Sequence, residues 1–177
     1  MSRVARDSRR SLAPAGALIF CLLCLLAGCA FRGGLTGNVY RDGPIVFRIG
    51  TLPGSWQRVQ IADGQLAFHH SQGGTILAHA TCEPQADASL DVLTNHLLFG
   101  IEQRREQART PISLDGRQAL RTCLVGRLDG VPIALELVVL KKDGCTYDLQ
   151  LASSPQVFAH RQPDFQRFVD GFARGAT

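Results

Sequence analysis

Apolar and polar residues alternate along much of the chain between residues 45 and 153, as they do in β-strands with one buried face. The last three of these segments are joined by Asp129-Gly130 and Asp143-Gly144, dipeptides typical of two-residue hairpin turns, so they predict a meander. The predicted strands cover residues 45–49, 56–61, 65–70, 75–82, 116–128, 131–142 and 145–153.

The hydrophobic period changes to about 3.6 residues in two segments, which predicts two helices. The first is a long amphipathic helix over residues 88–107. Its apolar stripe consists of Leu90, Leu93, Leu97 and Ile101. The second is a C-terminal helix over residues 162–173, with Phe165 and Phe168 on one face. The order of elements predicts an α+β fold, in which a long helix and a C-terminal helix pack on an antiparallel sheet.

The N-terminus has the three parts of a secretory signal peptide. The first ten residues carry four arginines against one aspartate, and residues 17–26 are apolar without a charge. Small residues follow the apolar run. That run is well short of the ~20 residues that a helix needs to span a bilayer, so we interpret residues 1–28 as a leader that is removed.

The end of this leader, Leu26-Ala27-Gly28-Cys29, resembles the lipobox of bacterial lipoproteins. The resemblance implies that Cys29 becomes the first residue and carries acyl chains such as palmitate, which would hold the protein on a lipid bilayer. Ala30 follows the cysteine, and by the same resemblance this favours the outer membrane over the inner one. An ordinary secreted protein cleaved near the same position is the alternative.

The rest of the chain suits one domain of ordinary composition. Residues 29–44 are rich in glycine and polar residues and predict a lipidated flexible tether, so a single α/β domain is expected over residues 45–177. Without the leader the chain has 15 basic and 14 acidic residues. Because no basic tract with interleaved aromatic residues remains, we expect no nucleic-acid partner.

Three cysteines remain in an oxidising compartment besides Cys29. Taking the long helix to lead directly into the strand at 116–128, we expect Cys82 and Cys123 to lie toward the same end of the sheet. Cys145 would then lie at the opposite end. This favours a Cys82–Cys123 disulfide, with three unpaired thiols as the alternative. The spacing fits no zinc motif, and no metal or other cofactor is expected.

One charged pair follows from the strand register. If Asp129-Gly130 makes a two-residue turn, Cys123 lies opposite Glu136, and Arg121 lies diagonally from that carboxylate. An ion pair between Arg121 and Glu136 is more often structural than functional. No nucleophile elbow, Ser-His-Asp order, phosphate-binding loop or paired-carboxylate motif occurs, so no catalytic residue is predicted and an enzyme is the less favoured class.

The order of elements also resembles the PsbP-like α/β/α sandwich over nearly the whole domain. The residues that carry this resemblance are Trp56, Phe68, Gly116, Ala119, Phe165 and Phe168. It implies a binding or assembly factor, here one of the cell envelope that faces the periplasm and has an envelope protein as its partner. A small-ligand carrier and a periplasmic hydrolase are the alternatives. An exposed apolar patch would favour partner binding, and an apolar cavity would favour the carrier.

Overall fold

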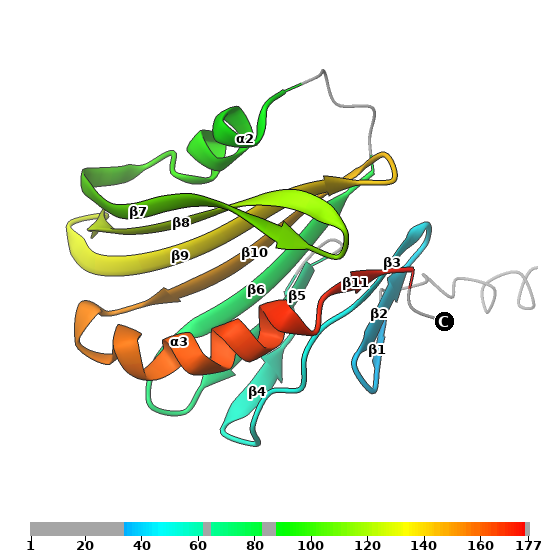
Figure 1. The fold of residues 1–177 in the computed structure, drawn as a ribbon. Coiled ribbons are helices and arrows are strands. Elements are labelled where there is room, and N and C mark those ends of the chain that lie inside the picture. The colour runs from blue at the N-terminus through cyan, green and yellow to red at the C-terminus, as the bar shows by residue number, and fades with distance from the viewer. Residues whose placement is uncertain (1–33, 62–64, 83–87, 176–177) are drawn as a thin grey trace, which may run out of the picture. The chain divides into compact units, whose positions relative to one another are not determined.

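The computed structural model describes residues 34–61, 65–82 and 88–175. In these residues the main element is an antiparallel sheet of seven strands (Figure 1). Its spatial order is β4 (Trp56–Val59), β5 (Gln65–His70), β6 (Thr75–Thr81), β10 (Cys145–Ser153), β9 (Val131–Lys142), β8 (Arg117–Leu128) and β7 (Ile101–Leu114). The predicted meander is confirmed, because β8, β9 and β10 are consecutive neighbours joined at Asp129-Gly130 and Asp143-Gly144.

A second, smaller sheet contains residues 34–44 and corrects that part of the flexible tether predicted over residues 29–44. Its strands are β1 (Gly34–Thr36), β2 (Val39–Asp42), β3 (Ile45–Arg48) and β11 (Ala173–Arg174), in that order. The glycines that suggested flexibility form turns instead: Gly37 and Gly43 have φ values of 56° and 53°. Tyr40 between them is only 2% exposed. Residues 29–33 and the predicted leader, 1–28, lie outside the described residues.

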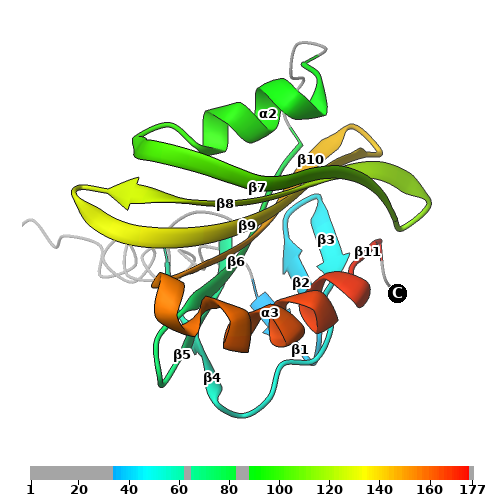
Figure 2. The ribbon, with the colours of Figure 1, turned by 60° about the vertical axis from the view of Figure 1, so that its left-hand side comes forward.

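Two helices cover opposite faces of the large sheet (Figure 2), which confirms the α+β class. Helix α3 (Pro155–Asp170) packs on β9 and β10 and joins the main core. Helix α2 (Leu90–Leu97) packs on β8 and β9. The buried core on the α3 face includes Leu66, Ile76, Val138, Leu149, Phe165 and Phe168, whereas that on the α2 face consists of Leu98, Leu124, Leu135 and Leu137.

The long helix predicted over residues 88–107 is wrong in its second half. Helix α2 ends at Leu97, Gly100 follows with a φ of 83°, and residues 101–114 form the edge strand β7. Residues 102–107 are polar and all exposed, so no apolar stripe held them in a helix. Pairing with β8 therefore outweighs the good helix propensity of their glutamate, glutamine and arginine side chains.

The C-terminal helix begins earlier than predicted. Its first residue is Pro155, a residue well suited to the first turn because it has no N–H to leave unpaired. Its end passes very close to the connection between β3 and β4, since the N–H of Gly50 donates to the Phe168 carbonyl at 3.0 Å. A Cβ atom on Gly50 would lie 1.8 Å from the Arg167 carbonyl oxygen, so only glycine fits there.

Asp115, in the turn between β7 and β8, joins the two sheets. Its carboxylate accepts from Lys142 Nζ of β9 and from the Arg174 N–H of β11, both at 2.7 Å. Burial alone would raise the pKa of this carboxyl, but the two donors hold it below its ordinary value. The small sheet is thus attached at the end of the large sheet where β8 begins.

Candidate functional site

A cavity of about 250 Å³ lies on the α3 face of the large sheet. Helix α3 covers β9 and β10, and β7 and β8 extend beyond it, which leaves space between the helix and these outer strands. We call this cavity the Cys123 pocket. It is lined by Ala108 and Thr110 of β7, Arg121 and Cys123 of β8, Glu136 of β9 and Gln162 of α3.

The structure brings Arg121 and Glu136 together in this pocket. Both Nε and Nη2 of Arg121 donate to Oε1 of Glu136, with an Nε–Oε1 distance of 2.6 Å. Gln162 Nε2 donates to the other carboxylate oxygen at 2.9 Å. The Glu136 side chain is 2% exposed and that of Arg121 is 28% exposed. A buried carboxylate is thus paired in charge and has a donor at each oxygen, as burial in a protein requires.

Cys123 lies opposite Glu136 in the register and is the free cysteine of the described residues. Burial raises the pKa of its thiol, the nearby Glu136 carboxylate raises it further, and Arg121 opposes them only in part. The thiolate is the reactive form of cysteine, and a raised pKa keeps the thiol protonated. The pocket therefore lacks an activated nucleophile at this position.

The predicted Cys82–Cys123 disulfide is wrong, because Cys82 is bonded to Cys145. The unpredicted strand β7 reverses the direction of every strand that follows it. As a result β8 is antiparallel to β6, and β10 starts beside the end of β6 with Thr146 opposite Thr81. Cys145 then lies directly across from Cys82, and Cys123 is on β8, which two intervening strands separate from β6.

A second feature is an exposed apolar group at the end of the sheet opposite Asp115. Phe99 is 93% exposed, Val131 is 64% exposed and Leu128 is 41% exposed. Leu128 pairs with both Ile101 and Val131, and Phe99 is two residues before Ile101, so the three residues lie at the end of the sheet where β7 starts and the β8–β9 hairpin turns. We call Phe99, Leu128 and Val131 the apolar tip. It continues the α2-face core, which includes Leu98 and reaches Ile101 and Ile133.

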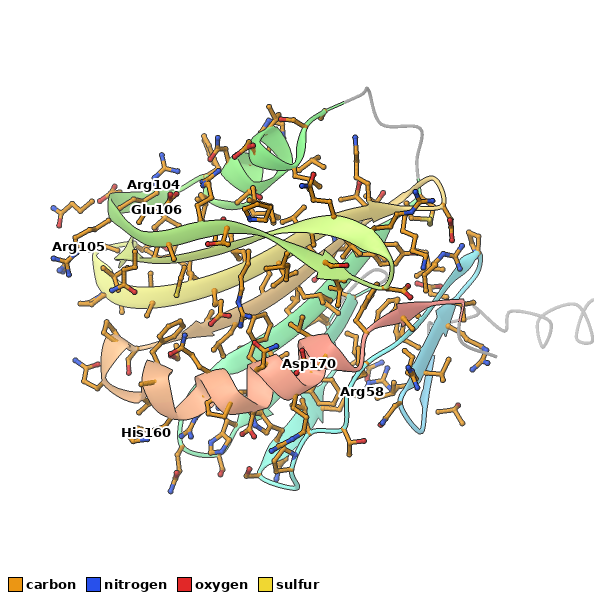
Figure 3. The ribbon with its side chains drawn as sticks, in the orientation of Figure 1. Arg58, Arg104, Arg105, Glu106, His160 and Asp170 are labelled. Carbon is orange, nitrogen blue, oxygen red and sulfur yellow. A yellow bond between two sulfur atoms is a disulfide. The ribbon has the colours of Figure 1, made fainter. Side chains whose placement is uncertain are left out.

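Arginines flank the apolar tip. Arg104 and Arg105 are exposed at the start of β7, where Figure 3 shows them pointing away from the body. In the described part of the chain neither has an ion-pair partner, whereas Glu106 is held by Arg109 at 2.9 Å. Arg127 donates to the Gly130 carbonyl within the hairpin. The tip therefore combines exposed apolar side chains with unpaired positive charge.

Sequence reasoning missed the tip for two reasons. Phe99 lies in the segment predicted as the long helix, where an aromatic residue is expected on the buried face. Leu128 and Val131 fit the alternation of apolar and polar residues in a strand. They are exposed because they lie at the end of the sheet, where no other element of the described residues covers them. The Asp129-Gly130 turn between them was the available signal, because hairpin turns usually lie at the surface.

The described residues hold no group of three or more histidine, cysteine or acidic side chains that could bind a metal ion. His79 lies 3.5 Å from Asp148 across β6 and β10, as an isolated pair. Neither α2 nor α3 has the length and apolarity that crossing a bilayer requires. The predicted lipidation residue, Cys29, lies outside the described residues.

No family model and no curated protein sequence matches the chain. Solved structures do resemble it. PsbP of the cyanobacterium Synechocystis sp. PCC 6803 superposes with a TM-score of 0.53 and 13% identity, covering 82% of this chain and 98% of that protein. The predicted PsbP-like fold is therefore confirmed.

Two further structures share the fold. LpqN of Mycobacterium tuberculosis, described as involved in cell envelope biogenesis, has a TM-score of 0.52 and 16% identity over 76% of this chain and 87% of its own. The protein PA94 of Pseudomonas aeruginosa is described as a regulator candidate of unknown function. It has a TM-score of 0.52 and 14% identity, over 73% of this chain and 90% of its own. At such low identities these comparisons establish the fold alone.

Proposed function

We propose that this chain is a bacterial envelope lipoprotein, attached to a bilayer through acylated Cys29, whose folded body is a non-catalytic binding or assembly factor. Its partner is an envelope protein that docks on the apolar tip. The observation that carries the proposal is the exposed, arginine-flanked tip at the end of the large sheet remote from the small sheet. Exposed apolar groups of this kind mark interaction surfaces.

Chain length supports a protein partner rather than the anchoring bilayer. Cys29 is five residues before Gly34 of β1, a separation of at most about 18 Å. The small sheet that contains β1 is attached beside Asp115, next to the start of β8. Strand β8 has 12 residues, so its far end, at the apolar tip, is roughly 35–40 Å from its start. An anchor at Cys29 therefore favours a tip that points away from the membrane.

Further support for the proposal comes from the predicted cellular location and from the chemistry of the side chains. Ala30 after the lipidated cysteine favours the outer membrane, and the envelope role described for LpqN agrees with an envelope location. The raised pKa of the Cys123 thiol disfavours a thiolate nucleophile, and Arg121 and Glu136 are hydrogen-bonded to each other. Both features suit a binding protein better than a hydrolase. The arginines beside the tip predict a partner surface that is apolar at its centre and acidic at its rim.

The proposal is tested with a photo-reactive phenylalanine analogue placed at position 99 in the full-length protein in cells. We expect irradiation to yield one discrete adduct, which mass spectrometry identifies as an envelope protein. The matched control carries the same analogue at Gln57, an exposed position on the opposite edge strand β4, and should not form that adduct.

Charge reversal at Arg104 and Arg105 to glutamate should abolish the adduct at position 99, because the predicted partner rim is acidic. Since both arginines are exposed and unpaired, the reversal should leave the melting temperature unchanged, which thermal unfolding checks. An adduct with lipid alone, equal labelling at position 57, or labelling that ignores the charge reversal would each contradict the proposal.

A further inference from the structure

We infer that the Cys123 pocket is a second binding site, which takes a small neutral molecule carrying a hydrogen-bond acceptor oxygen. This site is separate from the apolar tip, since the pocket lies on the α3 face and the tip continues the α2-face core. The inference therefore stands or falls independently of partner binding at the tip.

The pocket opens to solvent beside the exposed residues Ala108 and Thr110, so its volume sets the size of the part of a ligand that it can hold. A volume of about 250 Å³ equals that of roughly eight water molecules at ~30 Å³ each. It is below the ~300–1,000 Å³ of pockets that hold drug-sized ligands. The site therefore suits a molecule of about the size of a short amide, lactam or lactone.

Hydrogen-bonding groups in the pocket select an acceptor. Glu136 has a donor at each of its carboxylate oxygens, from Arg121 and from Gln162. Arg121 uses one N–H of Nε and one of Nη2 on that carboxylate. A guanidinium has five N–H groups, so three remain, and none of the described residues accepts a hydrogen bond from them. These N–H groups would donate to a carbonyl or hydroxyl oxygen inside the pocket.

Charge and surface in the pocket select a neutral ligand. The positive charge of Arg121 is already balanced by Glu136 at hydrogen-bond distance, so an anion gains little by entering. The remaining lining includes the methyl group of Ala108 and the protonated thiol of Cys123, which favour a short hydrocarbon body. A neutral molecule with one polar end and one apolar end satisfies both halves of the pocket.

The site is tested by titrating the ¹⁵N-labelled soluble body, residues 30–177, with 2-pyrrolidinone, after its dispersed spectrum has shown that it folds. We expect saturable amide shifts at Arg121, Cys123 and Glu136 in the millimolar range, which is usual for a ligand of so few atoms. Sodium acetate at the same concentrations should give no saturable shifts at these positions. Their absence with 2-pyrrolidinone, or equal binding of acetate, would overturn the inference.

Two variants separate occupancy of the pocket from general effects. Ala108→Leu adds bulk to the pocket lining without touching the ion pair and should weaken 2-pyrrolidinone binding at least tenfold. Ala159→Leu adds the same bulk at an exposed position of α3 and should bind like the parent protein. The double variant Arg121→Met/Glu136→Leu removes the guanidinium donors at similar volume and should also weaken binding. If Ala108→Leu bound as tightly as the parent, the pocket would not be the site.

Discussion

The variant Cys82→Ala/Cys145→Ala is expected to lose about 4 kcal/mol of free energy of unfolding. The two cysteines are 63 residues apart in sequence, so their bond removes much conformational freedom from the unfolded chain. It also fastens the end of β6 to the start of β10 in the middle of the large sheet. Urea unfolding of the soluble body measures the change, and the melting temperature should fall by roughly 10–15 °C.

Cys123→Ala is the matched control for this prediction. It removes a half-buried free thiol without breaking a bond, so it should cost about 1 kcal/mol or less. The account of the disulfide would be wrong if the double variant were as stable as Cys123→Ala. It would also be wrong if a reducing agent left the stability of the parent protein unchanged.

The second large effect is expected at the buried ion pair. Glu136→Leu leaves the Arg121 guanidinium without its counter-charge and Gln162 without its acceptor. Breaking a buried pair costs ~3–5 kcal/mol, and we expect about 3 kcal/mol because the Arg121 side chain is partly exposed and can turn toward water. Urea unfolding again gives the magnitude.

The double variant Arg121→Met/Glu136→Leu should recover to within about 1 kcal/mol of the parent protein, since apolar residues of similar volume often replace buried pairs without loss. Recovery would show that stability does not require the pair, which agrees with a role in ligand binding. A double variant as unstable as Glu136→Leu would contradict this, as would a single variant that loses nothing.

The meander was predictable from sequence because its turns are locally encoded. Asp129 and Gly130 have φ values of 50° and 77°, and Asp143 and Gly144 have 51° and 74°, which is the geometry that Asp-Gly adopts in two-residue hairpins. Turn length then fixed the register that set Cys123 opposite Glu136. The Arg121–Glu136 contact could therefore be reached by counting alone.

Strand β7 was missed although Asp115-Gly116, with φ values of 48° and 72°, joins it to β8 by the same kind of turn. Residues 102–107 are polar on both faces and form a strand only because β8 offers an edge for pairing. Strands β1 and β2 are short and separated by glycine, and one end of their sheet pairs with β11 from the far end of the chain. Such long-range pairing leaves no local pattern, and missing β7 was enough to misplace the disulfide.

The two candidate sites differ in the same respect. Residues from three strands and a helix line the Cys123 pocket, and the contribution of Gln162 depends on where α3 crosses the sheet. The apolar tip depends on which side chains the end of the sheet leaves uncovered. The spacing of residues along one element predicts neither the lining of the pocket nor the exposure of the tip. Both could be found only in the assembled fold.

The central claim, attachment through Cys29, is tested most directly by intact-mass measurement and membrane fractionation of the full-length protein. Its control carries Cys29→Ser behind the signal peptide of an ordinary secreted protein, so that leader removal no longer depends on the cysteine. We predict that the parent protein sediments with membranes, begins at Cys29 and carries the mass of acyl chains, whereas the control is soluble. A control that still sediments after its leader is removed, or a parent protein without added lipid mass, would contradict the account.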